Sequence, residues 1–491
     1  MPAARLTGLL PKERTKNMDE ALSENKESTA TAENSLVDGK GSLLLKILLY
    51  TLPVIASGVL QLLFNAADVI VVGRFSGDAA LAAVGSTGAL INLIVNLMTG
   101  LSVGASVSVA HAYGEKNDKV LSDVVHTSML VSVIGGILFG IIGFVGARTF
   151  LGWMATPENV IDLSTLYMRI YFIGVPIMMI YNFGASILRS IGDTKHPLIF
   201  LAVSGVLNVF LNLFFVIVLG MSVDGVAYAT VISQALSATL VVIFLMRAKG
   251  AYRLVLSKLR IHKHEFIKLL RVGIPAGLQG TVFSLSNVVI QSSVNAFGKI
   301  AMAGCTAASN IEGFIYVSMN SYYHAAVTFV GQNVGAGHPE RIRKVMMSCM
   351  LLVTITGGLL GAFAMIFRRE LLGIYCTENP LAIEYGIVRM TIISTTYVLC
   401  GIMDSFTGCI RGMGNSLAPM IIAMVGACGS RILWINTVYA WYVTTDEFAK
   451  LFMLFICYPV SWLLTVLALI VCFEIVRKNL YARMNVKKQT R

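Results

Sequence analysis

Residues 52–71 read LPVIASGVLQLLFNAADVIV, and residues 274–293 read IPAGLQGTVFSLSNVVIQSS. The two stretches align at a separation of 222 residues, and the identical pairs include Pro53 and Pro275, Gly58 and Gly280, and Asn65 and Asn287. A second pair aligns at the same separation: LRSIGDTKHP at 188–197 and IRGMGNSLAP at 410–419. The chain is therefore built from two copies of one unit, and the copies fix its overall organisation.

The composition places both copies in a membrane. Hydrophobic residues make up 56% of the 491 residues, and charged residues only 13%, against about 25% in soluble domains. Apolar runs recur along the chain, each near the roughly 20 residues that cross a bilayer as a helix. We expect an all-α polytopic membrane protein with twelve transmembrane helices, at about 46–72, 80–111, 122–146, 161–187, 196–219, 224–246, 266–297, 301–334, 343–367, 383–410, 417–442 and 449–475.

The repeat divides these spans into two homologous six-helix bundles, an N-lobe at 42–246 and a C-lobe at 265–476. Because six is an even number, the repeats are parallel, related by an axis along the membrane normal, with a central cavity between them. The remaining segments are expected to be a disordered cytoplasmic tail at 1–41, a basic cytoplasmic linker at 247–264 and a basic cytoplasmic tail at 477–491. This organisation is typical of transporters.

The formal net charge of +12 is explained by the orientation of the chain in the membrane. With both termini in the cytoplasm, 29 of the 38 Lys and Arg residues fall on the cytoplasmic side, six fall outside and three fall within spans. Cytoplasmic loops carry such an excess of basic residues. The surplus therefore does not indicate a nucleic-acid partner.

Catalytic motifs are missing from the sequence. No Walker A, HExxH or GxSxG pattern occurs in a plausible context, and the eight Cys residues form no CxxC or Cys/His ligand spacing. We expect the Cys residues to be small buried hydrophobes. The sequence predicts neither an enzyme nor a bound cofactor or metal, apart from a possible Na+ ion.

Three carboxylates fall inside predicted spans: Asp68, Glu312 and Asp404. A charge within the bilayer is costly, so each is a candidate functional residue. Gln61 and Asn65 lie seven and three residues before Asp68, which puts all three on one helix face. Such a polar face must meet protein or a water-filled cavity.

The repeat distinguishes the two lobes, because the second copy lacks the polar residues of the first: Asp68 aligns with Ile290, Asn208 with Ser430, and Asn212 with Trp434. If the first, fifth and sixth spans converge, four oxygen-bearing side chains form a protonation or hard-cation site: Asp68, Asn208, Asn212 and Thr230. Hydrogen bonding between helices uses the same residue types and is the alternative.

For other polar residues in the spans, a structural role explains the sequence about as well as a functional one. Glu312 and Asp404 are secondary candidates in the C-lobe, with the alternatives of a structural bond for Glu312 and a pair with Arg431 or Arg389 for Asp404. The two aligned prolines each remove a helix hydrogen bond, so we expect hinges at Pro53 and Pro275. Two isolated histidines are expected to have packing roles: His111 and His324.

The segments LPVIASGVLQLLFNAADVIVVGRFSGDAALAAVGS, FVGQNVGAGHPERI and RSIGDTKHP/RGMGNSLAP resemble the multidrug and toxic compound extrusion (MATE) transporters, over about residues 43–476. The resemblance implies a two-lobe antiporter of the bacterial inner membrane. It would export cationic and amphipathic small molecules using H+ or Na+, and we expect a monomer.

In the family branch with an amino-lobe coupling site, the central residue is an aspartate fifteen residues after the proline of the first helix. Pro53 and Asp68 keep this spacing. The branch's partners correspond to Asn208, Asn212 and Thr230, although the family often has an acid where Asn212 stands. A branch with carboxy-lobe Na+ ligands has Glu where this chain has Phe283, which argues against coupling there.

Two other functions remain open at this stage. A flippase of lipid-linked precursors has the same repeat architecture, and a polytopic membrane enzyme is a third possibility. Arg431 and Arg389 facing the cavity would favour the anionic lipid of a flippase, whereas Asp68 and Glu312 facing it would favour export of cations.

Overall fold

The structure is a computed structural model that describes residues 41–154, 156–376 and 379–489. The predicted tail at 1–41 therefore lies, except for Gly41, outside the described residues.

All regular structure in the described residues is helical. The first half consists of α2 (Leu43–Phe75), α3 (Asp78–Gly114), α4 (Asp118–Trp153), α5 (Glu158–Ser190), α6 (Lys195–Leu213) with the π-helical turn η1 (Phe214–Val218), and α7 (Val223–Arg247). The connection to the second half contains a 3-10 turn, η2 (Leu256–Lys258).

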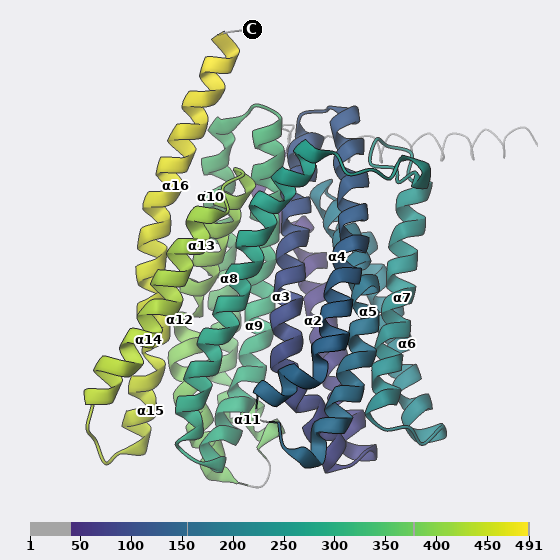
Figure 1. Cartoon of the computed structure of the whole chain (residues 1–491). Helices are drawn as coiled ribbons and strands as arrows, with labels where there is room; N and C mark the ends of the chain where they lie inside the picture. Colours follow the sequence, from purple (N-terminus) through teal and green to yellow (C-terminus); the bar gives the residue numbers. More distant parts are fainter. Residues whose placement is uncertain (1–40, 155, 377–378, 490–491) are drawn as a thin grey trace, which may run out of the picture.

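The second half repeats this order with more interruptions. It consists of α8 (Lys263–Asn295), α9 (Lys299–Gly335), η3 (Pro339–Arg341), α10 (Ile342–Ile366), α11 (Arg368–Tyr375), α12 (Pro380–Gly412), α13 (Leu417–Ala423), η4 (Met424–Gly429), α14 (Ser430–Trp434), η5 (Ile435–Tyr439), α15 (Glu447–Phe455) and α16 (Cys457–Gln489). The long helices run side by side as one bundle, and the last turns of α16 project beyond it (Figure 1).

The aligned sequence motifs form the same local structure in both halves. Gly192 and Gly414 follow the ends of α5 and α12 with φ of 102° and 86°, a left-handed conformation that glycine adopts without strain. Pro197 and Pro419 lie in the first turns of α6 and α13, where a missing backbone donor costs nothing. Each repeat thus ends one helix and starts the next with the same residues.

Eleven helices among the described residues are long and apolar enough to cross a membrane. The span predicted at 301–334 corresponds to α9, which is as long as α3, at 37 residues, but too polar to be counted. Several of its polar side chains are buried within the protein, among them Glu312, Gln332 and Asn333. Contact with protein instead of lipid explains why this helix is less apolar.

The two lobes interlock through the first two helices of each repeat. α8 packs along α3 of the other lobe, and α2 packs on both α6 and α9. In Figure 1, α2, α3, α8 and α9 lie in the middle of the bundle, whereas α6 lies at its right edge. Glycines permit the close approach of α3 and α8, since a Cβ on Gly100 would lie 2.0 Å from the Gly277 nitrogen. Small residues serve the same purpose in other membrane helix pairs.

At the end of the bundle predicted to be cytoplasmic, two related hydrogen bonds join the lobes. His111 Nε2 lies 2.7 Å from the Gly412 carbonyl oxygen, and Gln332 Nε2 donates to the Ser190 carbonyl oxygen at 2.7 Å. Ser190 and Gly412 are themselves 222 residues apart, so each lobe contacts the end of the same helix in the other. The lobes are therefore closed against each other at this end.

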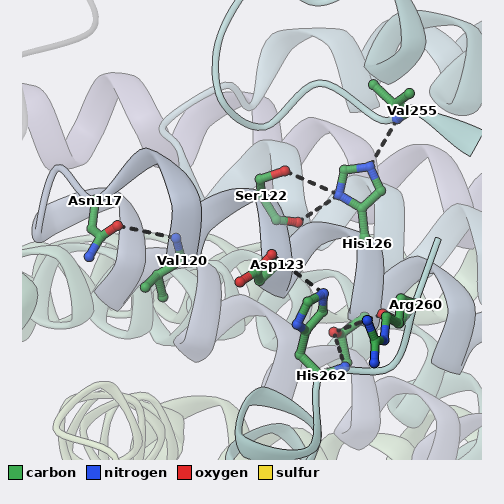
Figure 2. Close-up of polar contacts among 9 residues, drawn as sticks. Asn117, Val120, Ser122, Asp123, His126, Val255, Arg260 and His262 are labelled. Carbon is green, nitrogen blue, oxygen red and sulfur yellow. Dashed lines mark hydrogen bonds and ion pairs between the residues drawn. The ribbon is translucent and has the colours of Figure 1, made fainter. Parts of the chain in front are cut away.

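The connection between the lobes is docked on α4, as Figure 2 shows. The Val255 nitrogen donates to His126 Nε2 at 3.0 Å, and the ring's Nδ1 lies 2.7 Å from the Ser122 carbonyl oxygen. Farther along, the His262 nitrogen donates to Thr127 Oγ1 at 3.1 Å. The predicted basic linker at 247–264 is thus attached to the N-lobe by specific hydrogen bonds.

The close approach of α3 and α8 predicts a position-specific effect of adding one methyl group. Gly100→Ala should reduce stability by about 1–3 kcal/mol, because the new Cβ would overlap the α8 backbone. Gly88→Ala on the same helix is the control, since its Cβ would meet nothing within 4 Å, and alanine is the better helix former. Thermal unfolding of the purified variants measures both effects; equal melting temperatures would contradict this packing.

Candidate functional site

The polar residues predicted to form a site in the N-lobe lie on three helices. Asn212 Nδ2 donates to Asp68 Oδ1 and, at 3.3 Å, to Asn208 Oδ1. The Thr230 hydroxyl donates to the Val226 carbonyl oxygen at 3.0 Å and lies near the Asp68 carboxylate. The structure therefore brings Asp68 of α2, Asn208 and Asn212 of α6, and Thr230 of α7 into one cluster.

One oxygen in this cluster has no partner. Asn212 is fully buried, and its Oδ1 accepts no hydrogen bond in the described part of the protein. The π-helical turn η1 begins two residues later, and such turns often mark functional positions. The cluster thus combines one carboxylate with a buried carbonyl oxygen that is free to accept a proton donor or a cation.

The two other polar residues of the first helix are placed differently. Gln61 and Asn65 are exposed side chains of α2, and neither makes a hydrogen bond to the described residues. Pro53 and Pro275 lie inside α2 and α8, each of which continues as a single helix through its proline.

The acids of the C-lobe have separate partners. Glu312 of α9 forms a buried ion pair with Arg389 of α12, with 2.8 Å between Glu312 Oε2 and Arg389 Nη2. Asp404 instead accepts a hydrogen bond from Asn320 Nδ2 at 3.0 Å, and no ion pair joins it to Arg389 or Arg431 in the described residues. The structural explanation offered for Glu312 matches the geometry, whereas the pairing offered for Asp404 does not.

A cavity of about 410 Å³ lies mainly in the C-lobe, with α3 forming its N-lobe wall. Amide, aromatic and charged side chains line it, including Gln279, Asn320, Asp404, Arg411, Arg431 and Trp462. A smaller neighbouring cavity of about 240 Å³ contains the Glu312–Arg389 pair. Neither cavity reaches Asp68, so the coupling candidates and the cavity belong to different lobes.

Arg411 was not among the candidates from the sequence. Its alignment with Arg189 in the repeat was visible, but that match suggested a shared turn structure and gave no sign that only the second copy faces a cavity. The sequence gave even less reason to place Tyr458 and Trp462 in a cavity, because two aromatic residues four apart on an apolar helix are ordinary core residues.

The described residues contain no group of three or more His, Cys, Asp or Glu side chains able to hold a metal ion. All eight Cys residues have free thiols, and six of them are buried. His324 lies at the wall of the larger cavity, next to the Tyr323 ring.

Two parallel lobes, polar centres within the spans and a cavity between helices define a polytopic membrane transporter. The chain belongs to the MATE family: the family model MatE matches residues 53–214 and again residues 275–435. The two matches begin 222 residues apart, in agreement with the repeat found in the sequence. Membership of this transporter family also confirms that the chain is not an enzyme.

Relatives and solved structures support the same assignment. The probable multidrug resistance protein YoeA of Bacillus subtilis (strain 168) is 30% identical over 394 residues, covering 78% of this chain and 84% of YoeA. The probable multidrug resistance protein NorM of Thermotoga maritima is 26% identical, and the match covers 78% of this chain and 82% of NorM. A MATE transporter solved in an outward-facing conformation has the same fold, with a TM-score of 0.82, 22% identity, and coverage of 90% and 97% of the two chains.

The ion pair of the C-lobe predicts an asymmetry between single and double substitutions. Glu312→Gln leaves the buried Arg389 without its counter-charge and should cost about 3–5 kcal/mol of stability. Replacing both residues, as Glu312→Leu with Arg389→Met, should recover much of this loss, because no unpaired charge remains. Thermal unfolding of all variants in the same detergent makes the comparison. If Glu312→Gln alone were as stable as the wild type, the ion pair would not contribute to stability.

Proposed function

We propose that this transporter is a secondary active antiporter that exports cationic and amphipathic drugs in exchange for H+ or Na+. It would act as a monomer in a bacterial inner membrane, with both termini in the cytoplasm. The observation that carries the proposal is the cluster of Asp68, Asn208, Asn212 and Thr230, because the second lobe has no counterpart. The names of the multidrug resistance relatives support the class of substrate.

The chemistry of the cluster suits exchange of a small cation. A carboxylate held in an apolar lobe is stabilised by taking up a proton or a metal cation. The unpartnered Asn212 Oδ1 would accept a hydrogen bond from protonated Asp68, or would ligate Na+ together with Asp68 and Thr230. Either ion would bind the same oxygens. Under this proposal, Asp68 is therefore the residue that couples ion uptake to drug release.

Rocking of the lobes provides the transport step. In the described conformation, the bonds from His111 to Gly412 and from Gln332 to Ser190 close the end predicted to be cytoplasmic. Opening towards the cytoplasm would break both bonds, and the prolines within α2 and α8 would let these helices bend. Asp68 would take up its ion from the outer side and release it on the inner side.

Substitution of the aspartate tests the coupling. Asp68→Asn keeps the size of the side chain but removes its charge, so gradient-driven drug efflux from proteoliposomes should fall to the background rate. Asp162→Asn is the matched control, because Asp162 is an exposed acid paired with Arg148 on the surface of the N-lobe. Efflux retained by a folded Asp68→Asn protein would refute the proposal.

The ion itself is tested by imposing pH and Na+ gradients separately. Because Asn212 replaces an acid in the family pattern, Asn212→Asp would add a second carboxylate beside Asp68. Two nearby carboxylates bind a cation more strongly than one, so the half-saturating Na+ concentration should fall by about tenfold. A wild-type protein that ignores Na+ but responds to pH would assign H+ as the coupling ion.

A flippase of lipid-linked precursors is the second candidate, and one observation favours it: Arg431 lines the larger cavity. Arg389 gives it less support, because Glu312 neutralises its charge. Reconstituted protein should accelerate transfer of a fluorescent polyprenyl phosphate between leaflets if this function holds. Unchanged transfer, together with active drug efflux, would exclude it.

A further inference from the structure

Two buried arginines in the larger cavity lack a carboxylate partner. Arg411 and Arg431 are only 6% and 2% exposed, and neither forms an ion pair with a described residue. The C-lobe neutralises its third buried arginine, Arg389, with Glu312. The positive charges of Arg411 and Arg431 therefore have no ion-pair partner among the described residues, and the carboxylate that lines the same cavity is that of Asp404.

Neutral groups hold each guanidinium in place. Arg411 donates to Tyr323 Oη at 2.7 Å and to Gln279 Oε1 at 2.8 Å, while its Nε has no partner. Arg431 donates from Nε to Ser461 Oγ at 3.0 Å and from Nη1 to Asn287 Oδ1 at 3.4 Å. These acceptors orient the groups without cancelling their charge, and a buried cation without a counter-charge is unfavourable.

Negative charge in the cavity wall is limited to one side chain. Asp404 is the one carboxylate in its lining, and it is hydrogen-bonded by Asn320. Two guanidinium groups against one carboxylate leave the cavity with a net positive charge. An anion entering it would gain the charge interaction with both guanidinium groups.

The walls define the rest of the ligand. Arg431 lies 4.2 Å from the Tyr458 ring centroid, with the rings of Trp462 and Phe283 at 5.9 and 6.0 Å. Tyr316 and Tyr397 also line the cavity. Aromatic side chains around a few oriented polar groups are typical of sites for small planar molecules.

We propose that this cavity binds amphipathic aromatic molecules that carry an oxyanion, a carboxylate or a phosphate, with Arg431 and Arg411 as its ligands. Their partners Asn287 and Gln279 are eight residues apart on α8, about 12 Å along the helix. The cavity thus offers an oxyanion position near each end, separated by aromatic walls. Anionic aromatic ligands would add a second class of substrate to the cations of the proposed function. Binding in the cavity does not depend on that function, whereas transport of the bound anion does.

Equilibrium binding of two dyes with the same ring system tests the assignment. Fluorescein carries a free carboxylate, whereas rhodamine 123 is a cation whose carboxyl group is a methyl ester. Fluorescence anisotropy with the wild-type protein in phosphatidylcholine nanodiscs should show tighter binding of fluorescein. Arg431→Gln and Arg411→Gln should each raise its Kd by about tenfold or more, as expected for loss of a charged hydrogen bond.

Arg169→Gln is the matched control, because it removes one positive charge from α5 at an exposed position outside the cavity. It should leave the fluorescein Kd unchanged. The comparison of dyes on the wild-type protein stands even if an arginine variant does not fold. Rhodamine 123 binding as tightly as fluorescein, or a fluorescein Kd indifferent to both arginine variants, would overturn the proposal.

A second arm separates a soluble ligand from a lipid headgroup. Adding phosphatidylglycerol to the nanodiscs should leave fluorescein binding nearly unchanged if the cavity takes soluble aromatic anions. Displacement of fluorescein by that lipid would assign the oxyanion position to lipid and overturn the assignment made here. Efflux of a cationic drug through Asp68 is measured independently, so either result leaves the proposed function to its own test.

Discussion

The interlocking of α3 and α8 is the contact on which the arrangement of this transporter depends. Because each repeat sends its second helix against the first helix of the other, neither lobe is independent of its partner. Glycines at the crossing bring the two backbones within contact distance, which side chains of ordinary size would prevent. The α3 residues at this crossing, Gly100 among them, form the N-lobe wall of the cavity, so packing between the lobes also shapes the binding space.

The lobes share a fold but divide their polar chemistry. The N-lobe holds one acid in a network of neutral oxygen-bearing side chains, with Asn212 as its centre. Around its cavities the C-lobe places the acids Glu312 and Asp404 and the buried arginines Arg389, Arg411 and Arg431, and among these Glu312 and Arg389 form an ion pair. We interpret this division as a separation of tasks, with a cation-coupling centre in one lobe and a ligand cavity in the other.

Much of this could be predicted from the sequence. The repeat at a separation of 222 residues predicted two copies of one helical membrane unit, and the two matches to the family model begin at that separation. The family was predicted correctly from the same segments. The polar N-lobe residues were found because the second copy lacks them, a comparison that needs no structure. Their role in coupling remains a prediction.

Contacts between distant helices were harder to predict. One of the two alternatives for Asp404, a pair with Arg431 or Arg389, is wrong, because spacing along a helix does not show that Asn320 of α9 is its partner. The position of Arg411 in the cavity wall was not predicted, because its match with Arg189 in the repeat does not show which copy lines a cavity. Polarity in α9 also reflects burial by other helices, which composition alone cannot distinguish from exposure to water.

Counterflow is the most direct measurement of the central claim, that drug and ion move in opposite directions through one protein. Proteoliposomes loaded with a cationic drug, without any imposed ion gradient, should take up H+ or Na+ as the drug leaves. The uptake should be reported by an internal pH or Na+ indicator and should stop when the drug gradient is spent. Drug leaving through the protein without any ion entering would contradict the account.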